Sequence, residues 1–417
     1  MRPLLIPIFC ALFLTACHKH KNDDPEPKAN LSVLVYIAGD CNLDASYYDY
    51  EEQRTINFVD EDIRQMMEGS KQLSKQQNLI VFVDRKNLPP YFLKVANGDT
   101  TRLYTYPEEM KSSDAATLKN ALQWVKDNFE AENYGLSLWG HADGWTICPA
   151  RAANAPRRAY GQDTANGTTW MNIPDMAKAL EDVCAGKPLR FIFADCCCFQ
   201  SIESAYELRN CTDYVIGSPA EIPGEGAPYN TVIPALFSNT NYWQLAVDAY
   251  FAQKSEDYEE PLSVIKTSEL ETLAQATKAA LTQSLEPLNS DGTNYPDVSN
   301  LIYYYDHCLY DMNDFMLRNT SSDVYTQWKR SYDAAVPYKK MATVWMSSSN
   351  HVPYIGNNYT VFNDFDVTEE RFGGVNMYVA QNANTLSTRN RSYAEKQRLT
   401  ISQMQWYKAA GYDALGW

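Results

Sequence analysis

The chain has 417 residues, 45% of them hydrophobic and 21% charged, which excludes a disordered or fibrous protein and allows one large core with a smaller companion domain. Its 36 Lys and Arg stand against 52 Asp and Glu, which gives a formal net charge of −16. Because no segment is rich in Lys or Arg, the chain offers no basic face for phosphates, and we expect no nucleic acid partner.

The N-terminus is predicted to be a signal peptide. Arg2 supplies a positive charge, and the apolar run from Leu4 to Leu14 is too short to span a bilayer. The four residues Leu14-Thr15-Ala16-Cys17 resemble a bacterial lipobox, which implies cleavage after Ala16 and a lipidated Cys17 at the start of the mature chain. A plain secretory signal cleaved before Cys17 is the alternative. No other apolar run approaches the ~20 residues that a spanning helix needs.

Residues 17–29 are predicted to be a lipidated tether between a membrane and the folded chain. The stretch HKHKNDDPEPKA after Cys17 is polar, charged and proline-containing, a composition typical of linkers that do not fold. Acyl chains contribute about 0.8 kcal/mol per buried CH₂, so they hold a protein to a membrane without a spanning helix. Because His18 and not an acidic residue follows Cys17, the resemblance to bacterial lipoproteins implies the outer membrane of the cell envelope.

Short apolar runs from residue 31 onward predict buried strands. Near-continuous runs of this length suit strands that are covered on both faces, as in a parallel sheet with helices packed over it. The four runs are LSVLVYIAG (31–39), NLIVFVD (78–84), YGLSLWG (134–140) and LRFIFAD (189–195).

Two amphipathic segments between these runs predict helices. The segment DAATLKNALQWVKDNF (114–129) begins at a Ser113 or Asp114 N-cap and has its apolar residues along one stripe. In IPDMAKALEDVCAGK (173–187), Pro174 fits the first turn and Gly186 suits the C-terminal cap. Alternating strands and helices predict an α/β sheet with right-handed crossovers.

Beyond roughly residue 290 the pattern changes, and we interpret the rest as a smaller C-terminal domain. The segment NLIYYYDHCLYDMNDFML (300–317) is predicted to be helical, whereas MATVWMSS (341–348) and GGVNMYVAQ (373–381) are predicted to be strands. An amphipathic segment that carries tryptophan ends the chain at Trp417.

Two reactive side chains follow neighbouring predicted strands. His141 comes directly after the run 134–140, and three cysteines, Cys196 to Cys198, follow the run 189–195. Because active sites of open parallel sheets lie at the carboxyl ends of strands, a thiol and the imidazole are expected to approach each other there. An imidazole beside a thiol accepts its proton and later donates one to a leaving amine.

The alternation of side chains along a strand indicates which thiol reacts. If the strand stays extended, Asp195 and Cys197 point to the same side and Cys196 to the other. An acid beside a thiolate favours a substrate that brings a cation between them, such as an Arg or Lys side chain. A metal site built from the three cysteines is the weaker alternative, because consecutive residues diverge, and no metal ligands are expected.

Three stretches resemble the clostripain family of cysteine peptidases, which is related more distantly to caspases, legumains and gingipains. They are GDCNLD (39–44), WGHADGW (139–145) and ADCCCFQSIESAYELR (194–209). The resemblance implies a caspase-like fold in which Cys197 is the nucleophile, His141 the base and Asp195 the acidic floor of a pocket for Arg or Lys at P1. It places the oxyanion hole at the backbone N–H groups of Ala142 and Cys197, and it is the only reason to consider calcium, since no cofactor is otherwise required.

The chain departs from the family pattern beside both reactive residues. Ala142 stands where the family commonly has glycine after the histidine, and Cys196 and Cys198 are unusual neighbours of the nucleophile. Oxidation beside Cys197 would silence it. A catalytically inactive homologue that binds peptides or glycans at a cell surface is therefore the alternative function.

The stretch from Ala142 to Trp170 is longer than an ordinary connection, which favours a functional segment. It contains Arg157 and Arg158 in the small-residue sequence PARAANAPRRAYGQD. Members of the family mature by cutting themselves in this region, so we hypothesise self-processing after Arg157 or Arg158. An exposed loop that happens to contain arginines is the alternative.

These observations together predict an envelope-anchored, monomeric cysteine endopeptidase of peptides or proteins with Arg or Lys at P1. The expected fold is a caspase-like, mostly parallel sheet with helices on both faces, followed by a smaller α+β domain. The expected boundaries are a signal peptide at 1–16, a tether at 17–29, a catalytic domain at 30–290 and a C-terminal domain at 291–417.

Overall fold

The computed structural model of the protein describes residues 28–49, 53–147, 159–165, 167–253, 259–289, 293–305, 309–346 and 366–417. The predicted signal peptide and lipidated Cys17 lie outside these residues, as do Arg157 and Arg158. No helix in these ranges is long and apolar enough to cross a membrane.

A nine-stranded sheet forms the centre of the described chain, in the order β14-β12-β11-β10-β7-β1-β4-β5-β6. The five strands from β11 to β4 are parallel to their neighbours, and the strands outside them are antiparallel. The four apolar runs are β1, β4, β7 and β10, so the predicted α/β fold with a mostly parallel central sheet is confirmed. The strands are β1 (Ala29–Gly39), β4 (Gln77–Arg85), β5 (Leu88–Ala96), β6 (Asp99–Thr105), β7 (Ala131–Trp139), β10 (Phe191–Asp195), β11 (Tyr214–Gly217), β12 (Leu262–Lys266) and β14 (Tyr338–Lys340).

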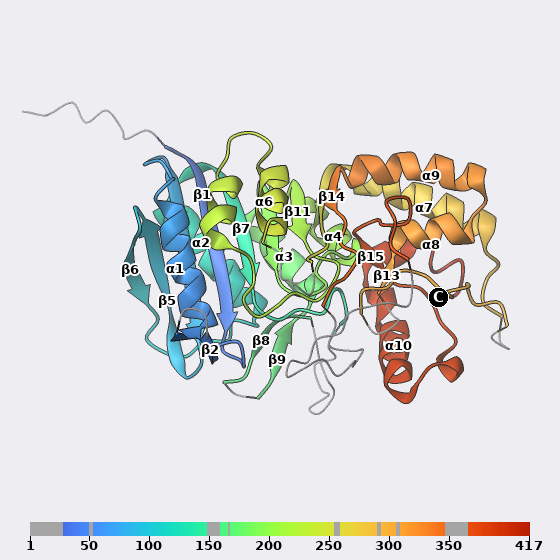
Figure 1. Ribbon diagram of the computed structural model, residues 1–417, viewed down its shortest axis with the longest axis horizontal. Helices are drawn as coiled ribbons and strands as arrows, with labels where there is room; N and C mark the ends of the chain where they lie inside the picture. The colour runs from blue at the N-terminus through green and yellow to red at the C-terminus, as the bar shows by residue number, and fades with distance from the viewer. Residues whose placement is uncertain are drawn as a thin grey trace, which may run out of the picture.

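Helices cover both faces of the sheet because its central strands are apolar on both sides. In β1, Tyr36 and Ala38 belong to one buried cluster, and Val35 and Ile37 belong to another, as the two-residue period of a strand requires. The first face is covered by α2 (Ala115–Asn128), α3 (Ile173–Val183) and α4 (Ile202–Glu207), and the second by α1 (Phe58–Ser70), α5 (Tyr229–Leu236) and α6 (Tyr242–Phe251) (Figure 1).

The two predicted helices begin where the sequence indicates. The side chain of Asp114 accepts a hydrogen bond from the Ala116 N–H and caps α2, which satisfies one of the N–H groups that a helix leaves unpaired at its start. Pro174 lies in the first turn of α3, where a missing N–H costs nothing. The helix ends at Val183, and Gly186 follows with a φ of +86°.

The region after residue 290 packs at the end of the sheet opposite β6 (Figure 1). The main sheet continues into it, because β14 pairs with β12, and one buried cluster extends from Leu34 to Trp417. The division into domains at residue 291 stays a prediction. Helix α7 (Leu270–Ser284) precedes this region. Besides β14, the region contains β13 (Tyr310–Asp311), α8 (Met312–Asn319), α9 (Ser322–Ala335), β15 (Asn376–Met377), α10 (Thr388–Thr400) and α11 (Gln405–Ala409).

Three local predictions in this region were wrong or too long. Among the described residues of 300–317, only those from Met312 onward are helical. The residues before them make other contacts: Tyr303 pairs with Tyr310 in an isolated bridge, and the Ile302 N–H donates to the Asp314 carboxylate and not to a helix carbonyl. Residues 341–346 form no strand, and the predicted strand at 373–381 is reduced to β15.

Two short hairpins flank the carboxyl ends of the central strands. They are β2 (Ser46–Asp49) with β3 (Arg54–Asn57), and β8 (Tyr160–Asp163) with β9 (Thr169–Met171). Short 3₁₀ turns complete the described elements, at Leu208–Asn210, Thr267–Glu269, Ala383–Thr385 and Ile401–Gln403.

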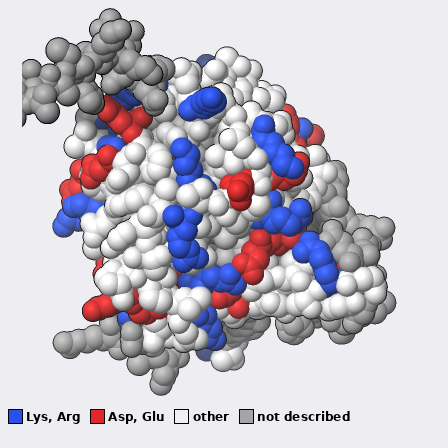
Figure 2. All heavy atoms as spheres, turned by 90° about the vertical axis from the view of Figure 1, so that its left-hand side faces the viewer, with Lys and Arg blue, Asp and Glu red and all other residues white. Residues whose placement is uncertain are grey.

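The surface beyond β6 carries charges of both signs. Figure 2 shows Lys and Arg side chains on this face with Asp and Glu among them and uncharged residues between. The net charge of −16 is therefore not gathered into a single acidic patch on this face.

Candidate active site

A cleft of about 660 Å³ opens at the carboxyl ends of β1, β7 and β10. His141, Ala142, Asp195 and Cys197, which the sequence singles out, all line it. The sheet brings them together because β7 lies between β1 and β10, so the residues that follow these strands meet at one edge. The other lining residues are Asn42, Leu43, Lys86, Trp139, Gly140, Gln162, Thr164, Trp170, Glu221, Ile222, Pro223, Gly224, Gly226 and Met346.

Cys197 lies in a turn and not on the extended strand. Strand β10 ends at Asp195, Cys196 forms a bend, and Cys198 has a φ of +55°. The continued alternation that the sequence argument assumed is therefore absent, yet Asp195 and Cys197 still reach the same cleft. The Cys197 sulfur accepts a hydrogen bond from the Ile222 N–H at 3.4 Å.

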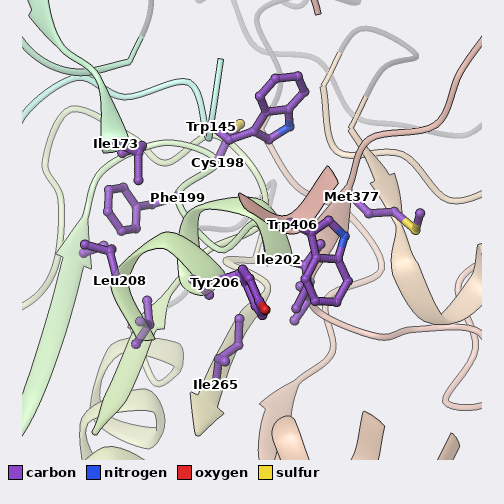
Figure 3. Close-up of a cluster of buried hydrophobic side chains, with 14 of the residues drawn as sticks. Trp145, Ile173, Cys198, Phe199, Ile202, Tyr206, Leu208, Ile265, Met377 and Trp406 are labelled. Carbon is purple, nitrogen blue, oxygen red and sulfur yellow. The ribbon is translucent and has the colours of Figure 1, made fainter. Parts of the chain in front are cut away.

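The two neighbouring cysteines point into the protein. Cys196 is 1% exposed and Cys198 is 0% exposed, whereas Cys197 is half-buried. Burial raises the pKa of the Cys196 thiol well above its usual value, so this thiol stays protonated at neutral pH. Figure 3 shows Cys198 beside Trp145 in the buried cluster. Of the three thiols, Cys197 is the one that a substrate in the cleft can reach.

His141 lies two residues after the end of β7 and is fixed at its backbone and its ring. Its carbonyl accepts a hydrogen bond from the Gly161 N–H at 2.8 Å. Its ring Nε2 lies 2.7 Å from Oδ1 of Asn42, and its ring centroid is 6.2 Å from that of Trp170. Asn42 was not predicted as a site residue, although it belongs to GDCNLD, one of the three stretches that resemble the family.

Ala142 pairs with Tyr160 in an isolated antiparallel bridge. The hydrogen bonds of this bridge run from Asp143 N–H to the Ala159 carbonyl and from Gly161 N–H to the His141 carbonyl, so they do not use the Ala142 N–H. Ala142 is 6% exposed and belongs to the buried cluster on the α2 and α3 side of the sheet. An oxyanion hole at Ala142 and Cys197 is compatible with this placement and stays a prediction.

Asp195 forms a buried acidic wall of the cleft. It is 3% exposed, and its two carboxylate oxygens accept hydrogen bonds from the Ala227 N–H at 3.0 and 3.1 Å. The Tyr250 hydroxyl donates a longer one at 3.4 Å. Burial raises the pKa of Asp195 to about 6, although these hydrogen bonds favour the ionised form. The carboxyl group is therefore mostly ionised at neutral pH.

Space beside Asp195 depends on Gly226. A Cβ at this position would lie 2.7 Å from Oδ2 of Asp195, and the residue has a φ of +62°. Only glycine adopts this backbone without strain and leaves the carboxylate open to the cleft.

Two further carboxyl groups lie deep beside this acid. Asp62 accepts a hydrogen bond from the Trp139 indole N–H at 2.5 Å, and Glu260 is 4% exposed. Burial and the charge of Asp195 both raise the pKa of Asp62 and of Glu260 well above the usual carboxyl range. These two groups are therefore protonated at neutral pH, which leaves Asp195 as the ionised one of the three.

The C-terminal region holds the turn that carries Cys197. The Asn376 amide donates to the carbonyls of Cys198 at 3.3 Å and Pro219 at 2.9 Å. Glu203 in α4, the helix after this turn, accepts a hydrogen bond from the Tyr378 N–H at 2.8 Å. Figure 3 shows Trp406 from this region packed beside α4.

No group of three or more His, Cys, Asp and Glu side chains in the described part of the chain is arranged to hold a metal ion. The family resemblance remains the only reason to consider calcium, and the proposed reaction uses none.

A thiol and an imidazole lining one cleft at the carboxyl ends of adjacent parallel strands define a cysteine peptidase of the caspase-like fold class. This class transfers an acyl group to the thiolate and then to water. The chain belongs to the clostripain family, whose family model matches residues 35–412.

Solved structures agree with this assignment. A secreted C11 cysteine protease from Bacteroides thetaiotaomicron, in complex with an irreversible peptide inhibitor, is 30% identical, with 93% of this chain and 100% of that chain covered and a TM-score of 0.72. An inactive zymogen C11 protease from Parabacteroides distasonis is 25% identical, with 92% and 99% covered and a TM-score of 0.71. No curated protein matches the chain. The protein is a cysteine-type peptidase with peptide or protein substrates.

Proposed function

We propose that the protein is an endopeptidase that hydrolyses peptide bonds after Arg or Lys, with Cys197 as nucleophile and His141 as base. The observation that carries this proposal is the buried, mostly ionised Asp195 in the same cleft as both residues. A carboxylate in a site of low dielectric pairs strongly with a guanidinium or ammonium group and rejects neutral or acidic side chains.

The reaction follows from the lining of the cleft. The thiol proton of Cys197 passes to the His141 imidazole, and the thiolate attacks the carbonyl carbon of the scissile bond. The negative charge that develops on the carbonyl oxygen is stabilised by the N–H groups of Ala142 and Cys197. The imidazolium then protonates the leaving amine, and water activated by the same imidazole hydrolyses the thioester and frees the thiol.

The P1 side chain enters beside Gly226, where the absence of a Cβ keeps Asp195 open. The carboxylate oxygens already accept the Ala227 N–H, which orients them, and each keeps lone pairs for a cation. Arg offers two parallel N–H donors and Lys one ammonium group, so both satisfy the acid.

Self-processing after Arg157 or Arg158 extends this proposal. Both residues lie outside the described chain, and β8 begins at Tyr160, so a cut there frees the chain directly before the strand that bridges Ala142. A solved relative that is described as an inactive zymogen supports this maturation. The lipid anchor at Cys17, the outer-membrane location and the monomeric state are also proposals, and a relative described as secreted supports export.

The test is release of a fluorophore from otherwise identical peptides that end in Arg, Lys or Gln at P1. We expect cleavage of the Arg and Lys peptides, lost in Cys197→Ala and His141→Ala and kept in Cys196→Ala and Cys198→Ala. Activity that survives Cys197→Ala but not Cys196→Ala would overturn the assignment of the nucleophile. Equal cleavage of the Gln peptide would overturn the P1 preference.

A further inference from the structure

We infer that Asn42 is a positioning residue for the proposed dyad: its side-chain oxygen holds Nε2 of His141 protonated and leaves Nδ1 to take the proton of Cys197. This inference rests on the proposed function, because it assigns a role within the same site. It adds a third side chain to a reaction that the sequence analysis described with two.

The contact that carries the inference is short and chemically directional. Asn42 Oδ1 lies 2.7 Å from His141 Nε2. An amide oxygen has lone pairs and no proton, so the imidazole must supply the hydrogen at Nε2. A neutral imidazole has one N–H, and its other nitrogen, Nδ1, then carries the lone pair that a general base needs.

The turn that carries Asn42 is closely braced. It follows β1, which pairs with β7 up to Ile37 and Trp139, so the turn lies next to the strand that ends two residues before His141. Within the turn, the Asp44 N–H donates to the Cys41 carbonyl at 3.3 Å. Cys41 itself is 1% exposed, which anchors the turn in the protein.

Asp44 connects the turn to the neighbouring strand. It accepts a hydrogen bond from the Arg85 guanidinium at 2.8 Å and another from the Asn57 amide at 3.0 Å. Because side chains on both sides of Asn42 are fixed, its amide is presented to the imidazole with little freedom to rotate away. Such support is what keeps a catalytic group within the narrow geometry that a reaction needs.

The same contact favours the charged form of the imidazole. When Nδ1 accepts the thiol proton, the positive charge spreads over the ring, and the hydrogen bond from Nε2–H to Oδ1 becomes charge-assisted. The Cys197 thiolate is thereby easier to form. After attack, the Nδ1 proton is donated to the leaving amine while Nε2 keeps its own, so proton and charge balance at each step.

The test compares Asn42→Ala, Asn42→Asp and the exposed control Asn128→Ala, with two readouts. For hydrolysis of an Arg peptide, we expect Asn42→Ala to lower kcat by about 10- to 100-fold with KM changed less than about threefold, because Asp195, the proposed partner of the P1 side chain, is kept. Asn42→Asp keeps an acceptor oxygen and is expected to restore most of kcat and to extend activity to higher pH, because a carboxylate stabilises the imidazolium further. The control should match the wild type.

The second readout is alkylation of Cys197 by iodoacetamide, whose rate follows the thiolate fraction. We expect Asn42→Ala to slow alkylation near neutral pH by about tenfold. This readout needs no substrate, so it tests Asn42 even if no basic peptide is cleaved, which would count against the proposed function alone. Unfolding by urea shows whether each variant is folded. A folded Asn42→Ala with unchanged kcat and alkylation, or a folded Asn42→Asp as impaired as Asn42→Ala, would overturn the inference.

Discussion

The pKa of Asp195 predicts how the proposed preference for a basic P1 residue changes with pH. Burial raises this pKa to about 6, so the fraction of free enzyme with an ionised carboxylate falls from about nine-tenths at pH 7 to about one-tenth at pH 5. Arg keeps its charge over this whole range. The selectivity for Arg over a neutral residue should therefore decline by about tenfold between pH 7 and pH 5.

The assay measures kcat/KM for two peptides that differ only at P1, Arg in one and Gln in the other, between about pH 5 and pH 8. The ratio of the two values cancels the titration of Cys197 and His141, which act on both peptides alike. We expect the ratio to be constant above about pH 7 and to fall below about pH 6, because kcat/KM reports groups on the free enzyme.

Replacing the carboxylate gives the matching control. Asp195→Asn keeps the size of the side chain and removes its charge, and losing one partner of a buried charge pair costs about 2–5 kcal/mol. In this variant, the ratio of kcat/KM for the Arg peptide to that for the Gln peptide should be at least about 30-fold lower than in the wild type at neutral pH. It should also be independent of pH. A wild-type ratio that does not change with pH, or a ratio that survives in Asp195→Asn, would refute the role of Asp195.

Four further predictions concern stability, the pocket and metal. Burial raises the pKa of Asp84 to about 8, so the folded chain keeps this carboxyl protonated up to about pH 8, whereas the unfolded chain loses the proton above about pH 4. The free energy of unfolding therefore falls by up to about 1.4 kcal/mol per pH unit between these values. In urea unfolding, Asp84→Asn should therefore become more stable relative to the wild type as pH rises from about 5 to 8. The exposed control Asp127→Asn should not, and an equal gain in both variants would contradict the role of Asp84. Gly226→Ala should lower kcat/KM for Arg peptides by at least about tenfold, since its Cβ meets Asp195 Oδ2 and its backbone is strained by about 1 kcal/mol; unchanged kinetics would disprove the crowding. Asn376→Ala leaves two buried carbonyls without their donor, so it should lower the free energy of unfolding in urea by about 1–3 kcal/mol and should also lower kcat. An unchanged kcat would show that the turn at Cys197 keeps its geometry without Asn376. Dialysis against EGTA should leave hydrolysis unchanged, and a loss restored by Ca²⁺ would show that the enzyme needs this ion.

The central strands could be predicted from the sequence because their physics is local. A run such as 31–39 is apolar at nearly every position, and only a strand covered on both faces needs that. The edge strands are harder to predict: β6 is mostly exposed and so lacks a long apolar run. The segment 300–317 was misjudged because its tyrosines are buried by contacts with distant parts of the chain, and not by a helix of their own.

The sequence allowed prediction of those residues of the candidate site that follow the ends of apolar strands. His141 and Cys197 lie within two residues of the ends of apolar runs, and the parallel pairing of β7 with β10 brings them into one cleft. Asn42 could not be assigned in this way, because its contact depends on β1 lying next to β7, and the order of elements along the chain leaves several strand orders open. The turn at Cys197 was also missed, because it depends on hydrogen bonds to residues near 220 and 376.

The anchoring by Asn376 of the turn that carries Cys197 has a consequence for biosynthesis. About 180 residues separate this amide from the Cys198 carbonyl that it binds, so the turn gains this support only after Asn376 has left the ribosome. Glu203 likewise gains its hydrogen bond from the Tyr378 N–H only after residue 378 has been made. A chain that ends before Asn376 would hold the turn at Cys197 without these bonds, so we expect the active geometry to form only after this residue has been made.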